Sequence, residues 1–144
     1  MKRIKRLLCA VLTLCMLAGM MTTFAAASER SSAYLSSYRA FLTADGNGKI
    51  SVTVDVRGTN YMTDIGAETI YIFESTDNVD FTMVATYEAE DYPDMMGSGS
   101  LYYETPIVHR GTAGRYYFAV VDVYAARNGG SDSREYETVS IRAT

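Results

Sequence analysis

The only histidine of the chain, His109, is the residue type best suited to acid–base chemistry near neutral pH. It could activate a serine such as Ser98 or Ser100 if a carboxylate oriented it. The sequence contains no Gly-x-Ser-x-Gly unit that would hold such a serine at a turn between a strand and a helix. One histidine also excludes the zinc sites that need several. We therefore expect a protein that is not an enzyme, and a small extracellular hydrolase is the least favoured alternative.

Acidic residues cluster in two predicted loops, where their oxygens could bind Ca²⁺. The candidate ligands are Asp77 and Asp80 in the first loop, and Glu88, Glu90, Asp91 and Asp94 in the second. Neither loop follows the twelve-residue EF-hand pattern, and charged residues at strand ends are usually solvated. The sequence therefore predicts no metal and no cofactor, with calcium binding as an open alternative.

The N-terminal 27 residues have the three regions of a secretory signal peptide. Four basic residues within the first six precede an apolar run from Leu7 to Met21, and three alanines end at Ala27. The apolar run is too short for a spanning helix, which needs about 20 apolar residues. Neither of the two cysteines, both inside this segment, follows a small residue as a lipoprotein site would require. We expect cleavage after Ala27, and secretion of residues 28–144 as a single domain that is free of the membrane.

The mature chain is acidic and has no cysteine. Removing residues 1–27 removes four of the 13 Lys and Arg and none of the 17 Asp and Glu, so the net charge changes from −4 to −8. Such a charge repels nucleic acid and anionic lipid, which excludes both as partners. Without disulfides, stability has to come from packing.

Alternating apolar residues, without a sustained helical period, predict an all-β fold. Val52 and Val54 alternate with Ser51 and Thr53, and the turn at 45–48 joins this strand to the preceding one as a hairpin. A strand with Pro106 belongs at an edge or a bulge. The predicted strands cover 38–44, 49–57, 69–77, 81–89, 101–110, 116–125 and 134–142, with loops at 58–68 and 90–100 and a turn at 128–133. Seven antiparallel strands of this spacing predict a β-sandwich.

Two stretches resemble fibronectin type III-like domains. "IYIFESTDNVDFTMVATY" is similar to their third and fourth strands, and "GTAGRYYFAVVDVYAARNGGSDSREYETVSI" is similar to their last two. The chain lacks the core tryptophan of that family, and its 90–100 loop is longer than usual. The resemblance implies a fibronectin type III-like or immunoglobulin-like sandwich of the kind found in small secreted bacterial proteins. It implies no activity.

The segment 116–125 is apolar on both faces of a strand. If Asp122 faces water, the inward residues are Tyr117, Ala119, Val121 and Val123, together with Ile70 and Ile72 on the neighbouring strand. Tyr117 would then be a strand-entry tyrosine that bonds back to nearby backbone. The outward residues would be Tyr71, Phe73, Tyr116, Phe118, Val120 and Tyr124, joined by Tyr136 if Val139 and Ile141 are core residues. Glu74 shares the parity of Ile72, so the register could reverse at that strand end.

The outward aromatic residues form a candidate contact surface, because a solvated sheet face normally carries polar side chains. One alternative is that the chain covers this surface itself, with residues 28–38 or with the loop that contains Met95 and Met96. If it is open, we expect a secreted, non-catalytic binding module for an extracellular protein or glycan. A self-associating structural component is the competing expectation.

Overall fold

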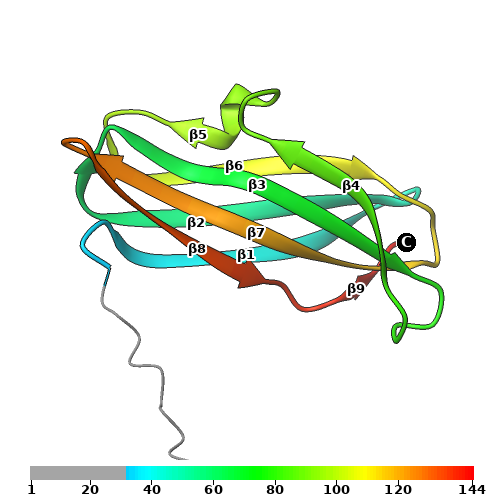
Figure 1. Ribbon diagram of the computed structural model, residues 1–144. Helices are drawn as coiled ribbons and strands as arrows, with labels where there is room; N and C mark the ends of the chain where they lie inside the picture. Colours follow the sequence, from blue (N-terminus) through cyan, green and yellow to red (C-terminus); the bar gives the residue numbers. More distant parts are fainter. Residues whose placement is uncertain (1–31) are drawn as a thin grey trace, which may run out of the picture. The chain divides into compact units, whose positions relative to one another are not determined.

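The computed structural model describes residues 32–144, so the expected signal peptide at 1–27 lies outside the described residues. Residues Ser32–Thr144 form one compact unit of two antiparallel sheets packed face to face (Figure 1). This confirms the all-β class. No helix of the described part is long and apolar enough to cross a membrane. The elements are β1 (Leu35–Gly46), β2 (Lys49–Met62), β3 (Asp64–Ser75), β4 (Thr82–Glu88), η1 (Pro93–Met95), β5 (Met96–Gly97), β6 (Ser100–Arg110), β7 (Tyr116–Arg127), β8 (Gly130–Glu137) and β9 (Ile141–Arg142).

The two sheets differ in size. The first has the order β1-β2-β6, and the second has the order β4-β3-β7-β8. The short strand β5, which the sequence does not predict, pairs with β3, and β9, the end of the strand predicted at 134–142, pairs with β7. β6 lies at an edge, as Pro106 indicates, because a residue without an N–H cannot serve a second neighbouring strand.

The core lies between the sheets and consists of alternate residues of their central strands. The side chains with 0% exposure include Ile50, Val52, Val54 and Val56 of β2, Ile65, Ile70 and Ile72 of β3, and Tyr117, Ala119, Val121, Val123 and Ala125 of β7. The predicted parity of β2, β3 and β7 is therefore confirmed.

Two Asn-Gly turns close hairpins. Asn47 and Gly48 have φ of 53° and 76°, and Asn128 and Gly129 have φ of 54° and 79°. Positive φ at both central residues is characteristic of the type I′ turn, whose twist matches that of the flanking strands. The hairpin at 45–48 is confirmed. The second turn is shorter than the predicted 128–133, because Gly130 already pairs with Arg127.

Two further boundaries differ from the sequence prediction. The predicted loop at 58–68 is mostly strand: β2 continues to Met62 and β3 starts at Asp64, because Met62 and Ile65 are buried in the core. The predicted strand at 134–142 is interrupted at 138–140. There the Thr138 side chain accepts a hydrogen bond from the Ala119 N–H (2.9 Å), while the Thr138 N–H donates to the Ala119 carbonyl (2.9 Å).

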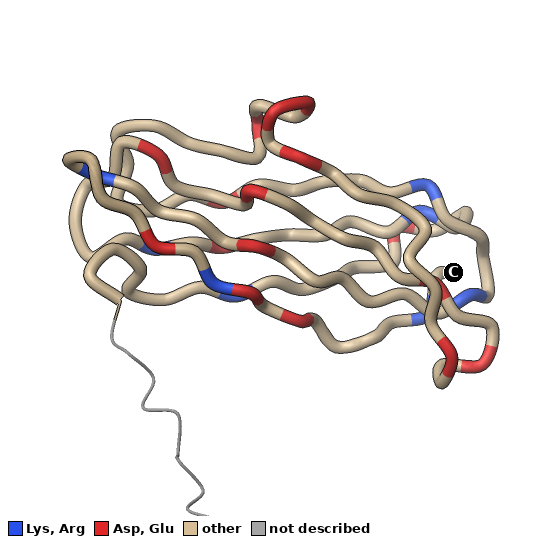
Figure 2. Tube along the Cα trace, in the orientation of Figure 1, with Lys and Arg blue, Asp and Glu red and all other residues tan. Residues whose placement is uncertain are grey.

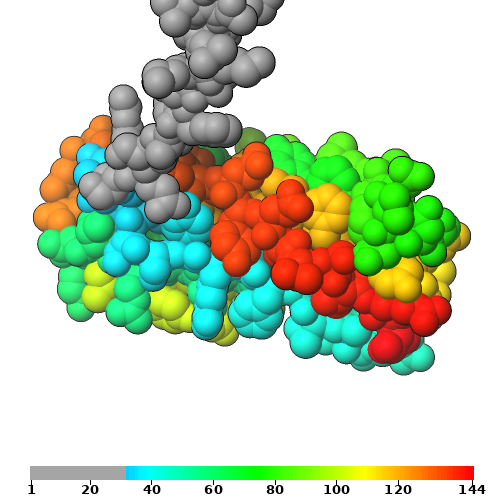
Figure 3. Space-filling model, turned by 90° about the horizontal axis from the view of Figure 1, so that it is seen from below, coloured from blue at the N-terminus to red at the C-terminus, as the bar shows by residue number. Residues whose placement is uncertain are grey.

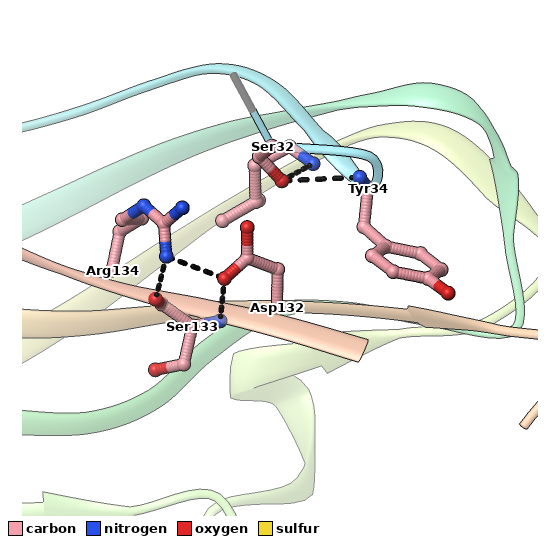
Figure 4. A network of polar contacts seen from close by, with 6 residues as sticks. Ser32, Tyr34, Asp132, Ser133 and Arg134 are labelled. Atoms are coloured by element: carbon pink, nitrogen blue, oxygen red, sulfur yellow. Dashed lines mark hydrogen bonds and ion pairs between the residues drawn. The ribbon is translucent and has the colours of Figure 1, made fainter. Parts of the chain in front are cut away.

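Side chains close the two open sides between the sheets. On one side, where Figure 3 shows β1 and β8 next to each other, Tyr38 packs edge to face on Tyr136 with ring centroids 6.2 Å apart. β8 also carries a charged pair, with Arg134 Nη1 2.5 Å from Asp132 Oδ1 (Figure 4). Such charges on an edge strand discourage pairing with another sheet.

The long loop at 90–100 closes part of the other side. Met95 is fully buried in the core, and β5 pairs with the start of β3. The carbonyl oxygen of Asp94 accepts hydrogen bonds from Tyr103 Oη (2.8 Å) and Thr105 Oγ1 (2.9 Å) of β6. The loop is therefore packed against the edge of the sandwich, between β3 and β6.

Candidate functional site

The outward face of the second sheet carries the six predicted contact residues. In the β3–β7 register, Phe73 lies opposite Phe118 and Tyr71 lies opposite Val120. Tyr116 pairs with Ser75 at one end, and Tyr124 pairs with Gly66 at the other. All six side chains are half-buried: Tyr71, Phe73, Tyr116, Phe118, Val120 and Tyr124. Strand alternation thus positions them together, and we call this set the aromatic face.

Three phenylalanines form the most tightly packed part of the aromatic face. The rings of Phe73 and Phe118 stack with centroids 4.7 Å apart and an interplanar angle of 1°. Phe81, just before β4, meets Phe118 edge to face at 4.8 Å. Phe81 is not among the residues predicted for this face. Strand parity would have found it, because Met83, two residues later, lies opposite Phe73 on the same face.

A groove of about 470 Å³ adjoins this cluster. It is lined by Asn78, Phe81, Phe118, Glu137, Thr138, Val139 and Ser140. The segments on its two sides are linked by a hydrogen bond of 2.7 Å from Ser140 Oγ to Asn78 Oδ1. Val139 is 85% exposed and Val79 is 75% exposed, so apolar side chains remain open to solvent at this end of the face.

Acidic residues form a row across the same face, next to its aromatic residues. Asp122 lies between Thr69 of β3 and Glu135 of β8, and Thr69 pairs in turn with Glu88 of β4. Figure 2 shows acidic positions along β3, β7 and β8 on this side. Because Asp122 separates Val120 from Tyr124, Tyr124 lies beyond this acidic row, apart from the phenylalanine cluster.

Tyr136 does not join the aromatic face, contrary to the expectation. It points toward the interior and packs on Tyr38, whereas Val139, expected in the core, is one of the most exposed residues. The alternation of β8 continues through the buried Thr138, so Tyr136 and Thr138 face inward and Val139 faces outward, and the parity changes only at the interruption before Ile141. Ile141 still packs partly against the core.

Neither segment expected as a cover lies over the aromatic face within the described residues. The loop with Met95 sits at the β3–β6 edge, as described above. The chain at 32–38 joins the first sheet, where the Thr59 N–H donates to the Tyr34 carbonyl (2.9 Å). Residues 28–31 lie outside the described part of the chain.

Tyr117 and Glu74 form a polar contact at the end of the core. The Tyr117 hydroxyl donates to Glu74 and accepts a hydrogen bond of 2.8 Å from the Thr112 N–H. This confirms the strand-entry tyrosine. It also explains why Glu74 shares the inward parity of Ile72. Burial, with the hydrogen bond to Glu74, raises the pKa of Tyr117.

His109 is half-buried beside this pair, and its Nδ1 lies 2.9 Å from the Tyr87 hydroxyl. Burial lowers the pKa of His109, while the charge of Glu74 acts in the opposite direction. Of the serines considered as nucleophiles, Ser100 donates its hydroxyl to the Tyr102 carbonyl at 2.5 Å. The contacts of the histidine are thus those of a residue that links β4 and β6.

In the acidic loop that begins at Asp77, the Asp77 side chain accepts hydrogen bonds from backbone N–H groups of the same loop. Asp77 Oδ1 accepts hydrogen bonds from the N–H groups of Val79 (2.9 Å) and Asp80 (3.0 Å) and from Ser75 Oγ (2.8 Å). These bonds lower the pKa of Asp77 to about 2. Among residues 32–144, no three His, Cys, Asp or Glu residues gather in a way that could hold a metal ion.

No protein-family model and no curated protein matches the chain. Among solved structures, it is similar to the sporulation control protein Spo0M of Bacillus subtilis, with 14% identity and a TM-score of 0.40 over 74% of this chain and 47% of Spo0M. It is also similar to a family 76 glycoside hydrolase from a bovine Bacteroides thetaiotaomicron strain, with 17% identity and a TM-score of 0.29 over 74% of this chain and 20% of the hydrolase. The chain thus spans about half of Spo0M and a fifth of the hydrolase.

Proposed function

We propose that this protein is a secreted, non-catalytic binding module whose aromatic face contacts a partner outside the cell. The observation that carries the proposal is the cluster of three packed phenylalanines, on an outward sheet face, beside a groove that no described segment fills. Aromatic side chains offer a large contact area at a low cost in conformational entropy. A face with no partner would gain nothing from them, because it would leave apolar area in water.

The chemistry of the face favours a protein as the partner. The groove offers Phe81, Phe118 and Val139 for apolar side chains, and the acidic row with Asp122 and Glu135 offers charge for Lys or Arg. Such complementary charge directs association and selects among partners. A glycan is the second candidate, because the hydroxyls of Tyr71 and Tyr116 could bond to its sugars.

Self-association through the same face is the competing function. The open apolar surface supports it, whereas the expected net charge of −8 and the acidic row oppose bringing two copies together. A twofold contact would have to place the groove of one copy against Val139 or Val79 of the other.

We also propose that the sandwich is of the fibronectin type III-like kind. The support is Tyr117, whose hydroxyl bonds to backbone five residues upstream, and the division of seven long strands into three and four. Both features characterise immunoglobulin-like sandwiches.

The experiment compares two double variants on opposite sheets. Phe73→Thr with Phe118→Thr removes the stacked pair of the aromatic face, and Phe41→Thr with Val108→Thr removes two exposed apolar residues from the outer face of the first sheet. Threonine keeps β-propensity in both. Each protein is immobilised and exposed to the extracellular fraction of the producing cells, and retained proteins and glycans are identified by mass spectrometry. Sedimentation at raised concentration reports self-association.

We expect the wild type and the first-sheet variant to retain the same partner and the aromatic-face variant to lose it. If the aromatic-face variant unfolds, Val139→Asp replaces it, because a side chain that is 85% exposed contributes little to packing. If the wild type and both variants retain the same proteins and glycans, the result contradicts the proposal. If the wild type and the first-sheet variant form dimers and the aromatic-face variant does not, the result favours a self-associating structural component.

A further inference from the structure

The outer face of the first sheet, opposite the aromatic face, contains a second constellation with its own cavity. Asp55 lies on the solvent-facing parity of the central strand β2, between Arg39 of β1 and Glu104 of β6. It is nevertheless only 5% exposed. A buried carboxylate on an outward strand face is costly unless hydrogen bonds compensate it, so its partners indicate what the arrangement does.

Asp55 holds two side chains in place. Its Oδ2 accepts a hydrogen bond of 2.5 Å from Arg39 Nε, and its Oδ1 accepts one of 3.2 Å from the Tyr102 hydroxyl. The single hydrogen of this phenol is shared with Glu104 Oε2, which lies closer, at 2.9 Å. The bond to Glu104, burial and the bond to Asp55 raise the pKa of Tyr102 to about 12, so this phenol stays protonated as a donor.

Tyr102 in turn supports a second guanidinium. The Cζ atom of Arg57 lies 5.8 Å from the centroid of the Tyr102 ring, a cation–π contact. Within residues 32–144, Arg57 makes no ion pair. Arg57 pairs with Ser37 in the β1–β2 register, which makes it the diagonal neighbour of Arg39 on the same face.

The two guanidiniums border a cavity of about 280 Å³, lined by Ser37, Tyr38, Arg39, Asp55, Arg57 and Tyr102. Arg39 uses only its Nε–H for Asp55, and its side chain is 69% exposed. A guanidinium has five N–H donors, so the four on its terminal nitrogens remain available. The lining has two positive charges and one negative charge in a protein whose net charge is negative.

We propose that this cavity binds a small ligand through its oxyanion, a carboxylate or a phosphate, held between the guanidiniums of Arg39 and Arg57. Planar guanidinium groups match both oxyanions through paired hydrogen bonds, and Ser37 supplies a hydroxyl donor beside them. Asp55 and Tyr102 are positioning residues, since they fix the two guanidiniums before the ligand arrives. The volume, at the lower limit for small-molecule pockets, fits a single small anionic group.

The experiment titrates the protein with inorganic phosphate, with acetate and with sodium chloride at matched ionic strength, and follows the amide signals of 37–39 and 55–57 by NMR. We expect saturable shifts with phosphate or acetate and none with chloride. Saturation by one anion only identifies phosphate or carboxylate as the group that the site selects. Arg39→Gln and Arg57→Gln each remove one guanidinium, and each should weaken binding about tenfold or more. The matched control is Arg110→Gln, an exposed arginine of β6 at the far end of this sheet.

Shifts that never saturate, or that chloride reproduces, overturn the proposal. It also fails if Arg57→Gln binds as tightly as the Arg110→Gln control. Arg57 is exposed and lies at no core position, so its replacement tests the site even if loss of the Arg39–Asp55 pair perturbs folding. Because this cavity and the aromatic face are on opposite sheets, either proposal can fail without the other.

Discussion

At the scale of single residues, Tyr117 shows how one side chain contributes both to the core and to the hydrogen bonds at the end of the core. Its ring is fully buried, and its hydroxyl joins Thr112 and Glu74. Removing the hydroxyl leaves the part-buried Thr112 N–H and the Glu74 carboxylate without this partner, which costs more than the net value of the bond. The same residue thus links β7, the preceding loop and β3.

We expect Tyr117→Phe to lower the free energy of unfolding by about 1 to 3 kcal/mol. Val54→Ala should cost a similar amount, about 1 to 3 kcal/mol, because it leaves a cavity at a fully buried position. Thr53→Ala, on the outward parity of the same strand, is the control and should change stability by less than about 0.5 kcal/mol. Urea denaturation measures all three. A costly Thr53→Ala with a silent Val54→Ala would mean that the register of β2 is wrong.

The pH dependence of stability should contain a contribution from His109. Burial lowers its pKa in the folded protein below the ordinary value of about 6.5, so the unfolded chain binds the proton more readily. The stabilisation is therefore complete above about pH 6.5 and is lost as the pH falls through the folded pKa. The loss cannot exceed about 1.4 kcal/mol per pH unit, the limit for one proton.

The measurement is the difference in unfolding free energy between the wild type and His109→Gln from pH 8 to pH 4.5. We expect the wild type to lose stability more steeply on acidification, because carboxylates titrate alike in both proteins. Parallel curves would show that folding does not lower the pKa of His109.

At the scale of elements, the two Asn-Gly turns are locally alike but lie in different surroundings. Gly48 and Gly129 occupy the same turn position with φ of 76° and 79°. A Cβ on Gly48 would lie 2.7 Å from the Gly111 carbonyl oxygen and 2.8 Å from the Ala113 nitrogen, whereas a Cβ on Gly129 would meet nothing within 4 Å. The first turn is therefore packed against the loop after β6, and the second is open.

We expect Gly129→Ala to cost about 1 to 2 kcal/mol, the strain of a left-handed residue with a Cβ. Gly48→Ala should cost clearly more, because backbone of the 111–113 loop must also move. Thermal unfolding of the two variants gives the comparison. Equal losses would contradict the packing of the first turn.

Strand parity predicts the inward and outward residues of β2, β3 and β7 correctly, since alternation is a local property of an extended chain. It fails for Tyr136 and Val139, because the parity of Ile141 cannot be carried back through the interruption at 138–140, where Thr138 bonds to Ala119 of another strand. The sequence did not predict the extended ends of β2 and β3, because Gly58 and Gly66 are typical of loops. The cavity at Asp55 was also not foreseeable, because it arises from side chains of three strands that meet only in the folded sheet.

At the scale of the whole molecule, the acidic surface is uneven. Acidic residues cross the face of the second sheet, while Figure 2 shows several basic positions near the C-terminus. Lys49 and Arg110 pair in register there, and Arg142 lies over the Tyr116 ring at 5.8 Å. The groove lies at this same end, since Ser140 lines it and Arg142 pairs with Tyr116. A partner would therefore place its apolar groups here and its basic groups over the acidic row at Asp122 and Glu135.

Export of the protein should leave a defined N-terminus. The order of basic, apolar and small residues predicts that the mature chain begins at Ser28, within one or two residues. Edman sequencing or intact-mass analysis of protein from the culture medium decides this. Retention of Met1 would contradict secretion through a cleaved signal peptide.

Site-specific photo-crosslinking shows whether the aromatic face is the contact surface. A photoreactive residue replaces Val139, 85% exposed at the groove, or Val108, 53% exposed on the outer face of the first sheet. After irradiation in the extracellular fraction, we expect a discrete adduct at position 139 that is absent at position 108 and is lost when Phe118→Thr is added. Adducts of equal yield at both positions, or none at position 139, would show that the aromatic face is not the contact surface.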